Sequence, residues 1–262
     1  MFLSIDGRDF SSFHFAGIMG SGMSAIAQYL AWEGRAITGS DRIAFAPEMK
    51  DTREKLERCG CRLFPQDGSG VTAARGALVI STAIEEDNPD IAAARKRGIP
   101  IVHRSDVLAA IVASRRTIAV CGTSGKSTVT ALAFEILRTC GQSPSLLAGA
   151  NLISLHEEGF LGNAFRGDSG LLVMEADESD GTLVKYRAEK AVFLNLSKDH
   201  KTVAQALELF ERLAGQTPLV IKNGDDPGLQ SIQAAHRFGL LEGADCRPEA
   251  VKAMTPSVRF TL

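Results

Sequence analysis

Short apolar runs alternate with helical patterns along the chain, and this alternation limits the fold more than any other feature of the sequence. Between residues 13 and 113, runs such as "FHFA" and "ALVIS" are each followed by apolar residues at helical spacing. Strands that alternate with helices form parallel sheets, because each helix returns the chain to the edge where the next strand begins. The pattern restarts at Thr117 and continues through "GLLVM" and "AVFL". We therefore expect an α/β protein with a Rossmann-like parallel-sheet domain at 1–114 and a second α/β domain at 115–262.

Two local patterns give more specific expectations. Ser105 precedes an apolar stretch that runs to Ala113, which predicts that Ser105 caps a helix there. Residues 154–169 are polar and rich in glycine, which predicts a mobile surface loop.

Composition excludes several classes of function. The 29 basic and 31 acidic residues nearly balance, which argues against a surface for nucleic acid or anionic membranes. The N-terminus shows no signal-peptide pattern, and no stretch approaches the roughly 18 apolar residues of a membrane helix. The five cysteines form no CxxC pair, so we expect a reduced, cytoplasmic protein without disulfides or structural zinc. Oligomeric state is not predicted.

The first glycine cluster, "AGIMGSGMSA", lies between an expected strand and an expected helix. Gly20, Gly22 and Ala25 have the spacing of a dinucleotide fingerprint, and Asp41 ends the second strand about 20 residues later. Glycines let the backbone approach a diphosphate, and the helix N-terminus offers it unpaired N–H groups. The cluster predicts a diphosphate site, with a simple tight turn as the structural alternative.

The second glycine cluster, "GTSGKST", also joins a strand to a helix. Its first glycine is Gly122, so the loop is shorter than the usual phosphate-binding loop, which would place a glycine at Val120. Lys126 is suited to neutralise phosphate oxygens, and the Ser127 hydroxyl to bind Mg²⁺. We expect a P-loop-type nucleotide site here, the alternative being a glycine turn with an incidental lysine.

Two polar segments follow later strands of the same expected sheet. "MEADESD" at 174–180 contains four acids, which would repel one another without a cation. "NLSKDH" at 195–200 ends in Asp199 and His200. Because strand ends in a parallel sheet meet at one edge, we expect these segments to lie near the Gly122–Thr128 loop and bind a metal with it. A solvated acidic turn and a structural histidine are the alternatives.

Taken together, these motifs resemble the Mur ligase family of ATP-dependent amide ligases in peptidoglycan assembly. The likeness runs from about Phe13 to Leu262. It includes "FAGIMGSGM", "TGSD" at 38–41, "STAI" at 81–84, "IPIVHR" at 99–104, the short "GTSGKST" loop, "EADESDG" and "NGDDP". The elements "STAI" and "EADESDG" are most like those of the member that adds alanine to UDP-N-acetylmuramate.

The resemblance implies a set of ligand contacts. For ATP it implies Lys126 and the rest of the loop, namely Gly122, Thr123, Ser124, Gly125, Ser127 and Thr128. For Mg²⁺ it implies Ser127, Glu175 and His200, and for catalysis Lys126, Asn151 and His200. For the UDP-sugar it implies Gly17, Gly20, Ser21, Gly22, Met23, Ser40, Asp41, Ser81, Thr82, Ala83 and Arg104.

The implied function is amide formation between the carboxylate of UDP-N-acetylmuramate and L-alanine through an acyl phosphate, in the bacterial cytoplasm. The sequence departs from the family pattern at Ser124, often histidine, and in the shortened segment after His200. The family's C-terminal domain has no counterpart, so we expect this chain to bind both nucleotides without necessarily completing ligation.

Three alternatives remain at this point. A sister ligase that adds a tripeptide, or glutamate to folate, would share the ATP loop. An NAD-dependent oxidoreductase would use Gly20, Gly22, Ala25 and Asp41, but would leave the Gly-Lys-Ser loop unexplained. A non-catalytic nucleotide-sugar-binding protein would use the same sites without turnover.

Overall fold

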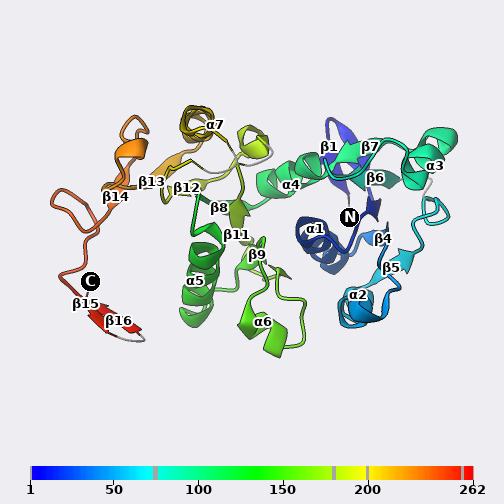
Figure 1. Cartoon of the computed structure of the whole chain (residues 1–262), viewed down its shortest axis with the longest axis horizontal. Coiled ribbons are helices and arrows are strands. Elements are labelled where there is room, and N and C mark those ends of the chain that lie inside the picture. The colour runs from blue at the N-terminus through cyan, green and yellow to red at the C-terminus, as the bar shows by residue number, and fades with distance from the viewer. Residues whose placement is uncertain (1, 73–75, 179–180, 199–200, 255–256, 262) are drawn as a thin grey trace. The chain divides into compact units, whose positions relative to one another are not determined.

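The computed structural model describes residues 2–72, 76–178, 181–198, 201–254 and 257–261 (Figure 1). The chain forms two compact units. Unit 1 contains Met1–Arg115 and Ala131–Val173, and unit 2 contains Arg116–Thr130 and Met174–Leu262. In the part of the chain that the structure describes, no helix has the length and apolar character needed to cross a membrane.

Unit 1 is built on a five-stranded parallel sheet, as the alternating pattern predicts. The strand order reverses at the neighbouring pair β3 and β6, which makes this a doubly wound sheet. In spatial order the strands are β5 (Cys61–Phe64), β4 (Ala36–Ser40), β3 (Ser12–Ala16), β6 (Gly76–Ile80) and β7 (Ile101–His103). A reversal of this kind leaves a crevice at the carboxyl ends of the strands, where ligands bind.

The helices of unit 1 begin and end at recognisable signals. Asn88 caps α3 by accepting a hydrogen bond from Asp90 N, and Gly98 ends it in the left-handed conformation. The predicted cap of α4 is wrong by two residues, because the His103 side chain accepts from Ser105 N and the helix begins at Arg104. The helical segments are α1 (Ser21–Trp32), η1 (Pro47–Met49), α2 (Lys50–Arg58), α3 (Pro89–Arg97), α4 (Arg104–Ala113) and α6 (Ile153–Glu157).

Helix α1 is enclosed on more than one side. Every residue from Met23 to Leu30 is buried, as expected for a helix covered all round. It packs on β4 and β5 and also on β9 (Ser145–Leu147) and β10 (Ala164–Phe165). Buried Asn163 fixes this second contact, since its Oδ1 accepts from Gln28 Nε2 at 2.9 Å and its Nδ2 donates to Ser24 Oγ at 2.9 Å.

The expected mobile loop at 154–169 is therefore wrong. This segment contains α6 and β10, and Leu155, Asn163 and Ala164 are buried. The prediction assumed that the polar residues of this segment face water. Asn163 instead faces inward and hydrogen-bonds α1. The N-terminal hairpin of β1 (Leu3–Ile5) and β2 (Arg8–Phe10) was also not predicted.

A second sheet has the order β10-β9-β11-β8-β12-β13-β14. Strands β8, β12, β13 and β14 are parallel neighbours, and α7 packs on β12 through Phe193 and Phe210, whose ring centroids lie 5.3 Å apart. The remaining elements are β8 (Arg116–Cys121), α5 (Lys126–Thr139), β11 (Leu171–Ala176), η2 (Thr182–Lys185), β12 (Lys190–Phe193), α7 (Val203–Gly215), β13 (Leu219–Asn223), η3 (Pro227–Leu229), β14 (His236–Phe238), β15 (Ala250–Met254) and β16 (Ser257–Thr261).

Candidate functional site

The loop Gly122–Gly125 connects β8 to α5 and is shaped by its two glycines. Gly125 has φ +78°, a conformation that favours glycine. A Cβ on Gly122 would lie 3.0 Å from Leu194 Cβ, so the backbone there passes too close to its neighbour for a side chain. The loop thus turns sharply at the carboxyl end of β8 and delivers the chain into the first turn of α5. The N–H groups of such a turn are suited to anions.

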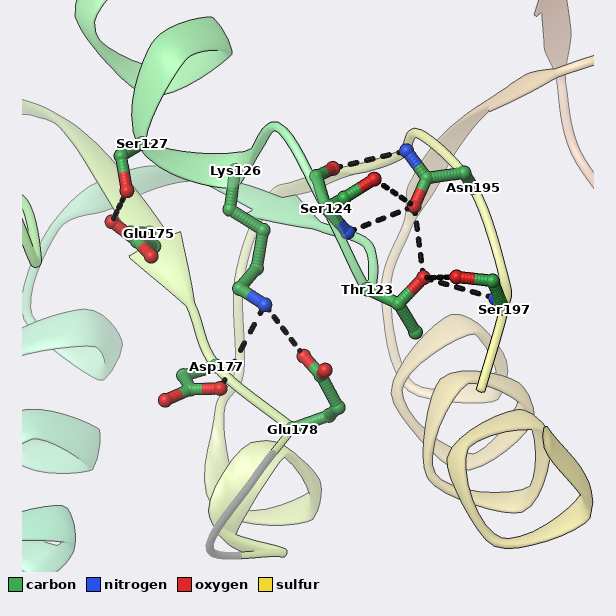
Figure 2. A network of polar contacts seen from close by, with 9 residues as sticks. All are labelled: Thr123, Ser124, Lys126, Ser127, Glu175, Asp177, Glu178, Asn195 and Ser197. Carbon is green, nitrogen blue, oxygen red and sulfur yellow. Dashed lines mark hydrogen bonds and ion pairs between the residues drawn. The ribbon is translucent and has the colours of Figure 1, made fainter. Parts of the chain in front are cut away.

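Asn195, which follows β12, holds this loop from the side. Its Oδ1 accepts from Ser124 N at 2.9 Å and from Thr123 Oγ1 at 3.0 Å, while its Nδ2 donates to Ser124 O at 2.9 Å (Figure 2). Thr123 Oγ1 also accepts from Ser197 N at 2.9 Å. The side-chain amide therefore acts as a brace for the loop. The predicted ligand set omitted Asn195, although its place after a strand neighbouring β8 could have identified it.

Lys126 points toward the acidic segment after β11. Its Nζ lies 3.0 Å from Glu178 Oε2 and 3.8 Å from Asp177 Oδ1, between the two carboxylates (Figure 2). The Lys126 and Glu178 side chains are nearly buried, 11% and 1% exposed. Glu178 Oε1 is also buried and has no hydrogen-bond partner among the described residues. The structure thus brings the lysine of the glycine loop and the acidic segment into one site, as the sequence predicts.

Ser127 and Glu175 form the second contact between the same two segments. Ser127 Oγ donates to Glu175 Oε2 at 2.9 Å. These two oxygens are suited to Mg²⁺, which in nucleotide sites takes one or two protein ligands and fills the rest of its shell with water and phosphate. Among the described residues, no cluster of three His, Cys, Asp or Glu side chains is arranged to hold a metal alone. The donor set therefore fits a metal that arrives with a phosphate ligand.

Charge supports the same fit. Asp177 and Glu178 lie beside Lys126 and Glu175 contacts Ser127, so these contacts include three carboxylates and one lysine. A triphosphate would add more negative charge to this region and would be repelled without a cation to offset it. A divalent metal supplies that offset.

Cys121 lies beside the loop but is not a nucleophile. It is fully buried, and burial together with the nearby Glu178 charge raises the pKa of its thiol. Since the thiolate is the reactive form, Cys121 is an inert strand residue, as the sequence suggests.

Asn151 and Thr128 make none of the contacts given above. His200, with Asp199, lies outside the described residues. Asn151 is exposed and belongs to unit 1, where it precedes α6. Thr128 lies in the first turn of α5 with its side chain exposed.

Unit 1 contains a separate cavity of about 280 Å³ at the carboxyl ends of its strands. Six of the residues predicted to bind the sugar nucleotide line it, which are Gly17, Gly20, Met23, Asp41, Ser81 and Ala83. Gly20 is also the N-cap of α1, with no side-chain hydrogen bond at that helix end. The cavity therefore combines a glycine turn, a helix N-terminus and the strand-order reversal, a combination that suits a diphosphate.

Of the other residues predicted to bind the sugar nucleotide, some lie close to the glycine turn or to α1, and others do not line the cavity. Arg104 lies against the start of α1, because a Cβ on Gly22 would come within 2.5 Å of Arg104 Nη1. Ser40 is buried, with its hydroxyl bonded to Asp90 and its carbonyl accepting from Gly17 N at 2.8 Å. Ser21 and Thr82 do not line the cavity.

Asp41 is committed to shaping the glycine turn. Its Oδ2 accepts from Met19 N and its Oδ1 from Ile43 N, both at 3.1 Å.

The chain is similar to a group of named ligases. Residues 12–116 match the family model described as Mur ligase family, catalytic domain. The chain is 35% identical over 270 positions to the UDP-N-acetylmuramate–L-alanine ligase of an Arthrobacter species, covering 95% of this chain and 56% of that protein. It is 38% identical over 229 positions to the Synechococcus enzyme of the same name, covering 83% and 47%.

A solved structure shows a similarity to the same kind of ligase. The UDP-N-acetylmuramate–alanine ligase of Thermotoga maritima superposes with a TM-score of 0.76 at 26% identity, over 92% of this chain and 55% of that one. The chain spans about half the length of the curated relatives it matches. The fold, both glycine turns and these likenesses have one explanation: the chain belongs to the Mur ligase family.

Proposed function

We propose that this chain supplies the nucleotide-binding part of an ATP-dependent ligase that joins L-alanine to UDP-N-acetylmuramate. In this proposal, residues 1–114 form the domain that binds the sugar nucleotide, and 115–262 form the domain that binds ATP. The main support is the meeting of Lys126 and Ser127 with Glu178 and Glu175 at the end of the β8 loop. The names of the alanine-adding relatives supply the substrates.

The reaction we propose needs no protein nucleophile. The muramyl carboxylate attacks the γ-phosphorus of ATP, releasing ADP and forming an acyl phosphate. The alanine amine then attacks the acyl carbon, inorganic phosphate leaves, and the amine loses a proton. Charge builds up on the transferring phosphoryl group, where the Lys126 ammonium and the loop N–H groups stabilise it.

Before it can act on phosphate, Lys126 has to exchange partners. Its ammonium lies between Asp177 and Glu178, and phosphate oxygens replace these carboxylates when the nucleotide binds. Mg²⁺, held by Ser127 and Glu175, would neutralise phosphate charge when bound. Asn151 and His200 remain proposed as residues near the substrate and the metal.

The test is calorimetric titration of the chain with a non-hydrolysable ATP analogue plus Mg²⁺, and separately with UDP-N-acetylmuramate. We expect both ligands to bind, at independent sites. In Lys126→Ala, the ATP analogue should bind at least about tenfold more weakly, because a charge-assisted phosphate contact is lost. Binding of the sugar nucleotide should be unchanged.

Lys190→Ala is the matched control, because Lys190 pairs with Glu189 at the start of β12 and not with the loop. It should leave both affinities unchanged. Equal loss of both ligands in Lys126→Ala would contradict two separate sites. Binding of both without any ligation when alanine and ATP are supplied would support a binding role for this chain over complete catalysis.

A further inference from the structure

Arg42 is the one basic residue among the described residues that line the cavity of unit 1. Its Nη2 donates to Glu85 Oε2 at 2.8 Å, and both residues line the cavity. Arg42 follows β4 and Glu85 follows β6, and these are the two neighbours of β3 in the sheet. The ion pair therefore joins the loops on either side of the glycine turn that follows β3.

This ion pair is weakly held. The Arg42 and Glu85 side chains are 69% and 65% exposed, so water screens their attraction. A diphosphate offers two oxygens that the planar guanidinium can bind at once, and its higher negative charge strengthens both hydrogen bonds. Exchanging Glu85 for phosphate costs little, because the released carboxylate is already largely hydrated.

The other polar groups of the cavity do not offer a positive charge. Asp41 is anionic and holds the glycine turn through Met19 N and Ile43 N. Gln66, Ser81 and Asn88 are neutral. A diphosphate in this cavity would therefore meet the α1 N-terminus and one cationic lining residue, Arg42. Arg42 is already paired with Glu85.

We propose that Arg42 changes partner when a nucleoside diphosphate enters the cavity, leaving Glu85 and binding the diphosphate. This inference rests on the proposed function, which places a UDP-sugar in unit 1. Glu85 then competes with the ligand for Arg42 and selects ligands whose anionic group binds a guanidinium more strongly than a carboxylate does. Arg42 strengthens binding, whereas Glu85 weakens it and raises selectivity.

The two substitutions that break the pair should therefore act in opposite directions. Arg42→Ala should weaken UDP binding about tenfold or more, since a charge-assisted contact is lost. Glu85→Gln should strengthen it several-fold, because Arg42 is released for the ligand. If the pair only braced the two loops, both changes would weaken binding.

The experiment is calorimetry of the whole chain with UDP and with uridine, which lacks the diphosphate. Arg42→Ala and Glu85→Gln should change UDP affinity and leave uridine affinity alone. Arg95→Ala is the matched control, because it breaks another exposed ion pair, Arg95 Nη2 to Glu86 Oε2 at 2.6 Å, outside the cavity lining. It should change neither affinity.

The outcomes separate the two proposals. A wild-type chain that binds neither UDP nor UDP-N-acetylmuramate overturns the proposed function and this inference with it. A wild-type chain that binds UDP, with both variants weakened or both unchanged, overturns the partner exchange alone. Opposite changes for UDP with no change for uridine support it.

Discussion

Lys126 shows how single residues control this site. Its ammonium already contacts carboxylates at 3.0 and 3.8 Å, so a nucleotide must offer more than another weak acceptor. Under the proposed function, a metal-bound triphosphate meets this demand, because the metal binds the carboxylate oxygens and the phosphate oxygens bind the lysine. The acids after β11 thus hold the lysine in the free protein, and under the proposed function they would also favour a cation near the loop.

Replacing Glu175 should separate metal binding from nucleotide binding. In Glu175→Ala, the Ser127 hydroxyl loses its acceptor, and Mg²⁺ would lose the carboxylate that we propose as its ligand beside Ser127. We expect more Mg²⁺ to be needed for half-maximal binding of an ATP analogue, by about tenfold. The measurement is an affinity series at increasing Mg²⁺, with Glu189→Gln as a surface control. An unchanged Mg²⁺ requirement would remove Glu175 from the metal site.

The cysteines give a residue-scale prediction about reactivity. Burial raises the pKa of Cys59 to about 11 and that of Cys61 to about 12, and it also raises the pKa of Cys121. At pH 8 these thiols stay protonated and unreactive, because only the thiolate attacks. Iodoacetamide should therefore modify exposed Cys140 and Cys246 in the native chain and all five cysteines in urea, as read by mass spectrometry. Rapid native labelling of Cys121 would contradict the buried position of β8.

At the scale of elements, the glycine loop depends on a neighbouring strand as much as on its own residues. The loop turns at Gly125 and passes close to Leu194 at Gly122, and Asn195 then fixes Thr123 and Ser124. A loop held in advance loses less conformational entropy when phosphate binds. The conformation of the loop therefore depends partly on the segment after β12.

Asn195→Ala should loosen the loop without removing any group that bears charge. We expect a loss of about 1–3 kcal/mol in stability, because Ser124 N and Thr123 Oγ1 lose an acceptor. Affinity for Mg²⁺ and the ATP analogue should fall, while UDP binding stays the same. Asn223→Ala is the matched control, because Asn223 holds Leu194 O and not the loop. Equal effects of the two variants on ATP affinity would deny Asn195 a specific role.

The contrast between the loop and its brace shows what could be predicted from the sequence. Both glycine turns, with the strands and helices that they join, were predicted because their signals are local in the chain. The contact of Lys126 with the acidic segment was also expected, since strand ends of one parallel sheet meet at one edge. The roles of Asn195 and Asn163 were missed, because each depends on partners 71 and 135 residues away that no local pattern reports.

At the scale of the whole molecule, unit 1 is not continuous in sequence. Residues 131–173 belong with 1–115, and they cover the side of α1 that the five-stranded sheet leaves open. The contact is both polar and aromatic, through Asn163 to Gln28 and through Trp32, whose ring meets Phe160 edge-on at 5.8 Å. The stability of the part of unit 1 that contains the cavity is therefore expected to depend on a segment far along the chain.

Asn163→Ala tests this dependence. Loss of its hydrogen bonds to Gln28 and Ser24 should destabilise unit 1 by about 1–3 kcal/mol, since the groups left behind are buried. Trp32 is the one tryptophan of the chain and lies in α1, so its fluorescence in a urea titration reports unit 1. The control is Asn151→Ala, an exposed asparagine of the same segment, which should not shift the transition. An unshifted midpoint in Asn163→Ala would show that α1 does not need this cover.

The enclosed position of α1 also sets a rule for exchanging parts between relatives. A chimaera that takes its first 115 residues from one parent and the remainder from another would pair the Gln28 of one with the residue at 163 of the other. Crossovers at 115 should therefore yield poorly folded hybrids. Hybrids that carry 131–173 along with 1–115 should keep α1 correctly packed beside the cavity of unit 1.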